Sequence, residues 1–234
     1  VREYDYEDIS NDIDALIQRL GKPEPCLRIR SFFSHLACSE DAAMDDFTRL
    51  QIDRFRTWSS RIKQALDRDD IMCHILNSSG IVRFPEAQMD MVRLGIGLYG
   101  ISPEEEVQPF LRPVSQLKTR ISQLKEIPEG DSVGYNRRWV AKRDSRIAII
   151  SIGYADGLNR HLGYENGRVL VNGRQAPIIG SICMDMCFLD VTDIPCSEGD
   201  EVTIFGDVSL LKQISDAAGT IPYEILTSVS PRVK

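Results

Sequence analysis

The pattern of apolar residues changes near residue 110, and this change constrains the fold more than any other feature of the chain. Before it, helical and strand-like runs alternate. After it, short strand-like runs follow one another, separated by turn residues. Strands that alternate with helices predict parallel β/α units, whereas successive short strands predict an antiparallel β domain. The sequence therefore predicts an α/β domain over residues 1–108 and a β-rich, all-β domain over residues 109–234.

The first part alternates between helices and strands in five segments. Apolar residues from Ile9 to Leu20 lie on one helical face, and Gly21 is placed to end that helix. The other segments are a strand over 27–36, an amphipathic helix over 47–66, a strand over 71–76 and a strand-and-turn passage over 91–100. A closed (β/α)₈ barrel needs eight strands and about 250 residues. This part therefore predicts the C-terminal end of such a barrel, not a whole one.

Turn residues organise the second part. Asn172-Gly173 lies between two apolar runs and predicts a hairpin. Pro-Gly turns are expected before the strands that begin near Ser132 and Glu201. A short helix is predicted over 209–218, with Ser209 as its N-cap and Gly219 as its C-cap.

Charge and composition exclude several functions. A net charge of −7 argues against a nucleic-acid or anionic-membrane partner. No apolar run approaches the ~20 residues of a membrane helix, and the N-terminus lacks the apolar segment of a signal peptide. The six cysteines show no metal-ligand spacing and are expected to be reduced, mostly buried thiols. We expect a cytoplasmic protein without a metal.

Two apolar runs stop abruptly in small, reactive or charged residues: Ser151–Gly157 and Ser181–Asp185. Chemistry is often placed at such strand ends, because the strand fixes the backbone and the loop exposes the side chain. These two strand-end stretches predict a functional site in the β-rich domain.

Seven short motifs follow one another along the chain. They are Ser34-His35-Leu36-Ala37, His74 with Asn77-Ser78, Met91-Val92-Arg93-Leu94-Gly95-Ile96, Val133-Gly134-Tyr135, Gly153-Tyr154-Ala155-Asp156-Gly157, Cys183-Met184-Asp185 and Pro222-Tyr223-Glu224. In this order they resemble the C-terminal portion of alanine racemase. The resemblance implies a β/α barrel followed by a β domain, pyridoxal 5'-phosphate as cofactor, and interconversion of L- and D-alanine, which supplies D-alanine for peptidoglycan.

The resemblance also implies catalytic roles. Racemisation needs two bases on opposite faces of the amino acid, of which one is the lysine that carries the cofactor and the other is Tyr135. A tyrosine is a poor base at neutral pH, because its ordinary pKa is ~10. The implied help is a hydrogen-bonded chain from Tyr135 to His35 to Arg93. Arg93 is also implied to donate to the pyridine nitrogen without giving up its proton.

Binding roles follow in the same way. The residues implied for the cofactor phosphate offer backbone N–H groups or hydroxyls: Ser78, Gly95, Ile96 and Tyr223. Met184 is the implied substrate contact, and Asp185 and Tyr154 are implied to shape the entrance to the active site. In the family these β-domain residues reach the partner subunit's barrel, so the resemblance implies a homodimer with shared active sites.

The match departs from the family in its lysine. The family's cofactor lysine lies in a run like Val-x-Lys-Ala-x-Ala-Tyr-Gly, and none of the seven lysines here does. The carboxylate-binding arginine and the first five barrel strands also have no counterpart, and there is no initiator Met. We therefore expect a fragment that does not racemise alanine by itself.

Other functions stay open. A serine or broad-spectrum racemase would use the same scaffold. Related pyridoxal-phosphate decarboxylases also pair a barrel with a β domain, but their Cys-Asp substrate motif has no match here. The chain could also serve only as a non-catalytic, dimerising fragment.

Overall fold

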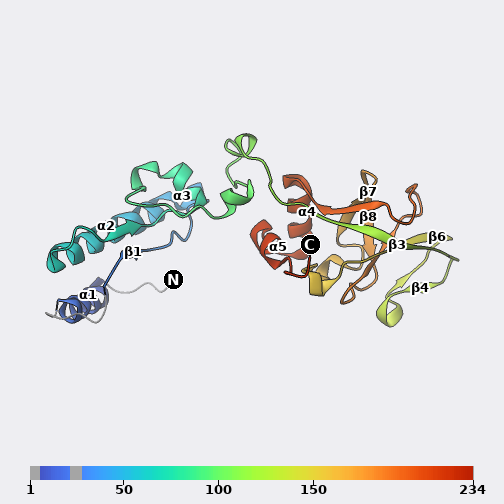
Figure 1. Ribbon diagram of the computed structural model, residues 1–234, viewed down its shortest axis with the longest axis horizontal. Helices are drawn as coiled ribbons and strands as arrows, with labels where there is room; N and C mark the ends of the chain where they lie inside the picture. Colours follow the sequence, from blue (N-terminus) through green and yellow to red (C-terminus); the bar gives the residue numbers. More distant parts are fainter. Residues whose placement is uncertain (1–5, 22–27, 234) are drawn as a thin grey trace. The chain divides into compact units, whose positions relative to one another are not determined.

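The computed structural model describes residues 6–21 and 28–233. The chain divides into two compact units, and the division falls between Arg112 and Pro113 (Figure 1).

Within its described residues the first unit contains three α-helices, two short strands and four 3₁₀ helices. These are α1 (Tyr6–Leu20), β1 (Ser31–Phe33), η1 (Ala42–Met44), α2 (Asp45–Leu66), β2 (Met72–His74), α3 (Ser78–Arg83), η2 (Pro85–Ala87), η3 (Ile96–Tyr99) and η4 (Gln108–Phe110). Strands β1 and β2 pair in parallel, with Phe33 opposite His74. A buried cluster forms the core: Leu36, Ile52, Ile75, Leu76, Phe84 and Ala87.

Local signals explain where the helices of this unit begin and end. Asp45 and Asp46 stand in the first turn of α2, where negative charge is favourable. The helix ends at Leu66 and is followed by the C-cap Asp67, whose φ of +51° is left-handed. Asn77 caps α3 by accepting a hydrogen bond from the Gly80 N–H at 2.9 Å. This cap makes Ser78 the first residue of the helix, directly after strand β2 and its buried continuation.

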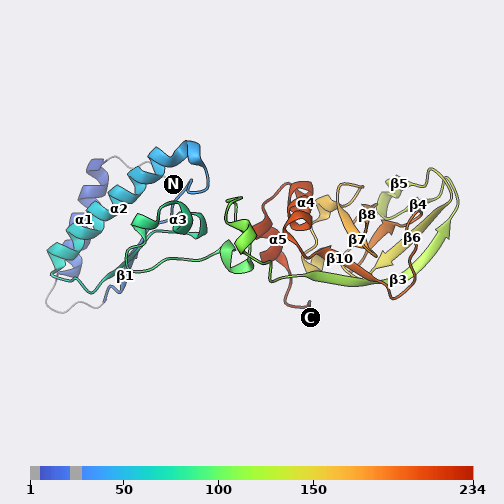
Figure 2. The same cartoon turned by 90° about the horizontal axis from the view of Figure 1, so that it is seen from above.

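The second unit is built around a closed barrel of six antiparallel strands, in the order β10-β3-β6-β9-β8-β7 (Figure 2). Its strands are β3 (Leu117–Ile127), β6 (Ser145–Ile150), β7 (Arg168–Val171), β8 (Arg174–Ile179), β9 (Cys187–Asp190) and β10 (Glu201–Phe205). A hairpin of β4 (Ser132–Val133) and β5 (Trp139–Val140) forms a separate two-stranded sheet. The remaining elements are η5 (Tyr135–Arg137), η6 (Tyr154–Asp156), η7 (Arg160–Leu162), α4 (Val208–Ala218) and α5 (Pro222–Ser228).

Apolar side chains fill the barrel, as expected for so few strands. Burial alternates along β7 and β9, so one face of each strand points inward. Asn172 (φ +50°) and Gly173 (φ +76°) form the predicted hairpin turn between β7 and β8. Gly130 (φ +88°) and Gly199 (φ +91°) occupy the predicted turns before β4 and β10. An α/β part followed by an all-β part is therefore confirmed.

Three local predictions were wrong. The passage over 91–100 contains no strand: Gly95 has φ −106° and ψ −103°, outside the strand region, and η3 follows. The strand predicted over 27–36 spans only Ser31–Phe33, and its first residue, Leu27, lies outside the described residues. The cap of α4 is Asp207 and not Ser209, because the Asp207 carboxylate accepts from the Leu210 N–H at 2.7 Å.

Candidate functional site

The residues implied for the site are divided between the two units. The first unit holds His35, Ser78, Arg93, Gly95 and Ile96, and the second holds Tyr135, Tyr154, Met184, Asp185 and Tyr223.

Arg93 is the centre of the first group. Its terminal nitrogens donate to the backbone carbonyls of Ser34 (2.6 Å), His74 (3.1 Å) and Ile75 (3.1 Å). They also approach the Nδ1 atoms of His74 at 2.6 Å and of His35 at 3.3 Å. The carbonyls lie at or just after the C-terminal ends of β1 and β2. Arg93 thus ties together two neighbouring strand ends, the edge where side chains converge in parallel sheets.

The contacts of Arg93 determine how the two histidines carry their protons. Arginine has only donors, so Nδ1 accepts in both rings and the ring N–H lies on Nε2. Burial, and then the charge of Arg93, lower the pKa of His74 below its usual value. Phe33 stacks on His74 with ring centroids 5.6 Å apart, and the Arg93 guanidinium lies 5.5 Å from the Phe33 centroid. His35 is exposed and keeps its Nε2–H as a donor.

His74 makes the stability of the first unit depend on pH. Because its folded pKa lies below 6.5, the unfolded chain binds the proton more readily. We expect the free energy of unfolding to hold above pH 6.5 and to fall as the pH drops from there towards the lowered pKa. Urea unfolding of a Trp139→Phe variant, followed by Trp58 fluorescence, measures this. His74→Gln should flatten the pH profile and His161→Gln should not; equal profiles for both would contradict the assignment.

Ser78 organises a loop of glycines beside the same strand end. Its Oγ accepts from the Gly95 N–H at 2.9 Å and from the Gly97 N–H at 3.2 Å. A Cβ on Gly97 would lie 2.8 Å from Leu94 Cδ1, so the exposed Leu94 side chain would have to move to admit a larger residue. Ile96 stands between the two glycines. The predicted phosphate residues Ser78, Gly95 and Ile96 are therefore neighbours.

These residues fit pyridoxal phosphate. Among the described residues the Arg93 Nε–H makes no hydrogen bond, which leaves one donor of the guanidinium for a ring nitrogen. Burial lowers the pKa of Arg93, and arginine side chains keep their proton in proteins. The Ser78 O–H and the Ile96 N–H are donors of the kind that a phosphate requires, whereas the Gly95 and Gly97 N–H groups already donate to Ser78 Oγ.

Tyr135 stands on a loop that packs backbone to backbone against the second strand-end stretch. Gly134 has φ +81° and Gly180 has φ +59°, conformations that glycine adopts at low cost. A Cβ on Gly134 would lie 3.1 Å from the Ser181 nitrogen, and one on Gly180 would lie 3.0 Å from the Val133 oxygen. The two residues before Tyr135 therefore pack against the beginning of this stretch.

The backbone after Tyr135 is strained. Asn136 (φ +59°) and Arg137 (φ +51°) are both left-handed, which costs non-glycine residues about 1 kcal/mol or more each. The Arg137 Nε–H donates to Ser132 Oγ at 2.9 Å and holds the turn. Tyr135 itself is 70 % exposed. Strain of this kind is typical of positions where a side chain must be presented in one orientation.

The two strand-end stretches lie against each other. Tyr154 donates its N–H to the Cys183 carbonyl and Ala155 donates its N–H to the Met184 carbonyl, both at 3.0 Å. A Cβ on Gly153 would lie 2.3 Å from the Met184 oxygen, so only glycine allows this approach. Tyr154 and Met184 remain 44 % and 53 % exposed. The structure therefore brings the predicted entrance and substrate-contact residues together on one surface.

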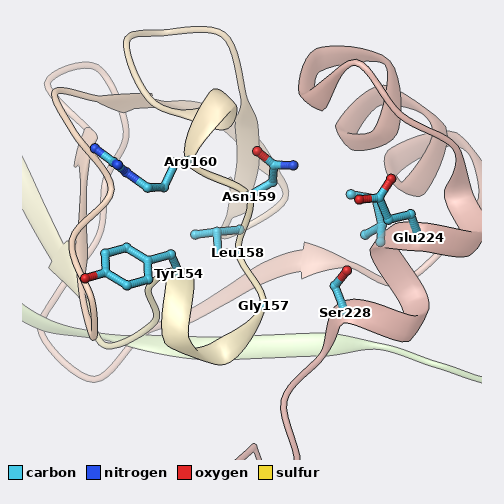
Figure 3. A pocket seen from close by; sticks show the side chains of 8 residues that line it. Tyr154, Gly157, Leu158, Asn159, Arg160, Glu224 and Ser228 are labelled. Atoms are coloured by element: carbon cyan, nitrogen blue, oxygen red, sulfur yellow. The ribbon is translucent and has the colours of Figure 1, made fainter.

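A groove of about 340 Å³ opens beside Tyr154 (Figure 3). Its lining residues are Tyr154, Gly157, Leu158, Asn159, Arg160, Glu224, Ile225 and Ser228. The Arg160 guanidinium lies 5.9 Å from the Tyr154 ring centroid, and Figure 3 shows Glu224 across the groove from them. Tyr223 lies in the first turn of α5, the same helix as Glu224, in the second unit; its place at the phosphate stays a prediction.

Sequence reasoning did not predict that Tyr164 and Arg138 lie beside the second strand-end stretch. The Tyr164 hydroxyl and Ser181 Oγ are 2.8 Å apart, and the Arg138 guanidinium lies 5.5 Å from the Tyr164 ring centroid. The hydrogen bond with Ser181, helped by the charge of Arg138, lowers the pKa of Tyr164. The only sequence signal was the pair Arg137-Arg138 just after Tyr135, because Tyr164 belongs to no strand-end motif.

No metal centre is formed within residues 6–21 and 28–233, where no three His, Cys, Asp or Glu side chains are grouped to hold an ion. The five cysteines in these ranges are free thiols, and Cys26 lies outside them. Burial raises the pKa of Cys183 and Cys187. Of the helices described, none has the length and apolar character needed to cross a membrane.

Two family models match the chain: "Alanine racemase, N-terminal domain" over residues 8–103 and "Alanine racemase, C-terminal domain" over residues 114–234. The alanine racemase of Sorangium cellulosum is 39 % identical over 233 residues, which cover 96 % of this chain and 60 % of that protein. That of Desulfosudis oleivorans is 39 % identical over 217 residues, covering 89 % of this chain and 55 % of that protein.

Solved structures show the same likeness. Alanine racemase from Streptomyces coelicolor matches with a TM-score of 0.84 and 32 % identity, covering 95 % of this chain and 60 % of that one. The Bartonella henselae enzyme, solved with covalently bound pyridoxal phosphate, matches with a TM-score of 0.80 and 33 % identity over 96 % of this chain and 60 % of that one. The chain thus spans 55–60 % of the length of these relatives. It contains part of the family's N-terminal α/β domain and its C-terminal β-barrel domain, and it belongs to the alanine racemase family.

Proposed function

We propose that the chain supplies the second base and much of the cofactor cradle of an alanine racemase, which interconverts L- and D-alanine for peptidoglycan synthesis. The single observation that carries this is the Arg93 guanidinium, which is held by three carbonyls and two histidine Nδ1 atoms and keeps one N–H to donate. Membership of the family supports the choice of reaction.

In the first unit Arg93 would donate Nε–H to the ring nitrogen of pyridoxal phosphate, and Ser78, Gly95 and Ile96 would hold the phosphate. The cofactor, when bound, delocalises the electron pair left when the α-proton of alanine departs. Because Arg93 keeps its proton, it would donate to the ring nitrogen without protonating it and so would leave the ring a weak electron sink. A weak sink of this kind suppresses side reactions such as transamination.

Tyr135 is the proposed base of this chain. Its exposed phenol would take or return the α-proton on one face of the amino acid, and Met184 would contact the substrate. The His35 Nε2–H is the donor proposed to stabilise the phenolate. We propose that Tyr135 serves the site of a partner subunit in a homodimer, with Tyr154 and Asp185 at the entrance and Tyr223 at the phosphate.

The other base is the family's lysine, for which the seven lysines here offer no matching run. We therefore expect the 234-residue chain to bind pyridoxal phosphate without forming D-alanine. Quenching of cofactor fluorescence measures the binding, and a coupled D-amino-acid oxidase assay measures the product. D-Alanine formed by the chain alone would contradict this prediction.

A fusion tests the proposal itself. Joining the unmatched N-terminal segment of the Sorangium cellulosum relative to this chain restores a family lysine, and the fusion should racemise alanine faster than serine. Tyr135→Phe should lower kcat by at least about a hundredfold, because general-base catalysis contributes that much, and should keep cofactor binding. A folded fusion that binds the cofactor without racemising any amino acid would favour the non-catalytic, dimerising alternative. Faster turnover of serine would favour a serine racemase.

A further inference from the structure

We propose that Arg232 is a positioning residue, which sets the place of Met184 and Tyr154 by bridging the Asp156 and Asp185 carboxylates. The bridge joins the two strand-end stretches, since each contributes one of the carboxylates. That Met184 and Tyr154 meet substrate rests on the proposed function; the bridge itself does not.

The geometry of the bridge is specific. Arg232 Nε lies 2.9 Å from Asp156 Oδ1, and its terminal NH2 nitrogen lies 2.5 Å from Asp185 Oδ1. Two separate nitrogens of one planar guanidinium are used, which a lysine ammonium cannot reproduce with the same spacing. The pairing with Asp185, and then the charge of Asp156, raise the pKa of Arg232, in keeping with a shared cation.

The Arg232 cation compensates the buried charge of Asp156. Asp156 is only 8 % exposed, and burying a carboxylate without a partner costs free energy. Its Oδ2 accepts from the Gly153 N–H at 2.8 Å, which leaves Oδ1 for Arg232. The Asp156 carbonyl also accepts from the Ser230 N–H at 3.0 Å, so the C-terminal segment is fixed here by its backbone.

The C-terminal segment is also held by shape. Gly157 has φ +104°, and a Cβ on it would lie 2.2 Å from the Ser228 oxygen. Residues 228–230 therefore run directly across the first strand-end stretch. Arg232 follows this fixed segment, and its side chain contacts Asp185 on the second stretch.

Asp185 depends on Arg232 more than Asp156 does. Its side chain is 52 % exposed, and within the described residues its carboxylate pairs with Arg232 alone. Asp185 follows Met184, so fixing the carboxylate fixes the adjacent side chain. Without Arg232 the tip of the second stretch keeps the backbone hydrogen bonds from Tyr154 and Ala155 and the one from the Cys183 N–H to the Met186 carbonyl, all of which hold main chain and not the Met184 side chain. Met184 is expected to become mobile while the barrel stays folded.

The methionine methyl signals test this directly. The chain has six methionines, of which Met184 and Met186 lie in the second unit and the other four in the first. In ¹³C-methyl-labelled protein, Arg232→Ala and Asp185→Asn should both shift or broaden the Met184 signal, assigned with Met184→Leu. The signals of Met44, Met72, Met89 and Met91 should stay in place. Arg232→Lys should give a smaller shift than Arg232→Ala, because one carboxylate keeps a cation.

Arg143→Ala is the matched control, since Arg143 pairs with Asp193, away from both stretches. It should leave the Met184 signal unchanged. A Met184 signal that is the same in wild type, Arg232→Ala and Asp185→Asn would overturn the proposal. If Arg232→Ala unfolds the second unit, Asp185→Asn, which retains Arg232 as the partner of Asp156, decides the question in the same way.

The fusion with the relative's N-terminal segment adds a kinetic readout. Arg232→Ala should raise KM for alanine about tenfold with a smaller change in kcat, the loss expected for one charge-assisted hydrogen bond. Arg143→Ala should change neither. A fall in kcat at constant KM would overturn the positioning role. A fusion that is inactive before any substitution would count against the proposed function. The methyl signals would still test whether Arg232 positions Met184.

Discussion

Arg93→Ala is expected to lower the free energy of unfolding of the first unit by about 3 kcal/mol or more. The variant removes every donor that Arg93 offers to the carbonyls of Ser34, His74 and Ile75. His74 and Ile75 are buried, so water does not readily replace those donors. The measurement is urea unfolding by Trp58 fluorescence in a Trp139→Phe background, which isolates the first unit. Cofactor binding should be lost in the same variant.

Arg49→Ala is the control for removing an arginine from this unit. Arg49 pairs with Glu86 at 3.0 Å, and its side chain is 56 % exposed. A surface pair of this kind contributes about 0–1 kcal/mol, so the variant should unfold close to wild type. Arg93→Lys should recover only part of the loss, since an ammonium lacks the planar fork. If Arg93→Ala were no less stable than Arg49→Ala, the network around Arg93 would not hold the strand ends together.

Gly153→Ala is expected to lower the free energy of unfolding of the second unit by about 3 kcal/mol. The φ of −145° and ψ of −166° at Gly153 are open to any residue, so the substitution does not strain the backbone dihedrals. The added Cβ, however, would lie 2.3 Å from the Met184 oxygen and 2.4 Å from the Cys183 oxygen. The two strand-end stretches must then separate, which breaks the hydrogen bonds between them. Trp139 fluorescence in a Trp58→Phe background follows the unfolding.

Gly206→Ala separates this effect from the general cost of replacing a glycine. A Cβ on Gly206 would meet Gln116 Cγ and Thr203 Cγ2 at 3.5 Å, an ordinary van der Waals distance. The variant should therefore change the free energy of unfolding by less than about 1 kcal/mol. Equal losses in Gly153→Ala and Gly206→Ala would show that the close approach at Met184 has no energetic importance.

Strong local signals made parts of the fold predictable from the sequence. The long helix α2 and the capped start of α3 follow from periodicity and from Asn77, which act within a few residues. The hairpin at Asn172-Gly173 follows from turn chemistry. The strand expected over 91–100 failed because its apolar run was interrupted by Gly95 and Gly97, whose conformations are set by contact with Ser78.

The candidate site was predictable only where the family motifs name a residue. The motifs pointed to Arg93 and His35, and the structure places their nitrogen atoms 3.3 Å apart. They did not point to Arg232, which lies 47 residues from its partner Asp185, or to Tyr164, which lies 17 residues from Ser181. Pairings across such separations leave no periodic signal in one chain, because they depend on how the strands close the barrel.

By itself the sequence determined the change from α/β to all-β structure, the turns, most helix ends and the family motifs, since these depend on short-range periodicity and backbone preference. Only the tertiary structure decided which residues meet. It brought Arg93 to the carbonyls of two strand ends, and it laid the stretches at Gly153 and Met184 against each other with Arg232 between their carboxylates. The physical reason is that buried hydrogen bonds, ion pairs and close glycine contacts join segments far apart in the chain, and barrel closure selects their partners.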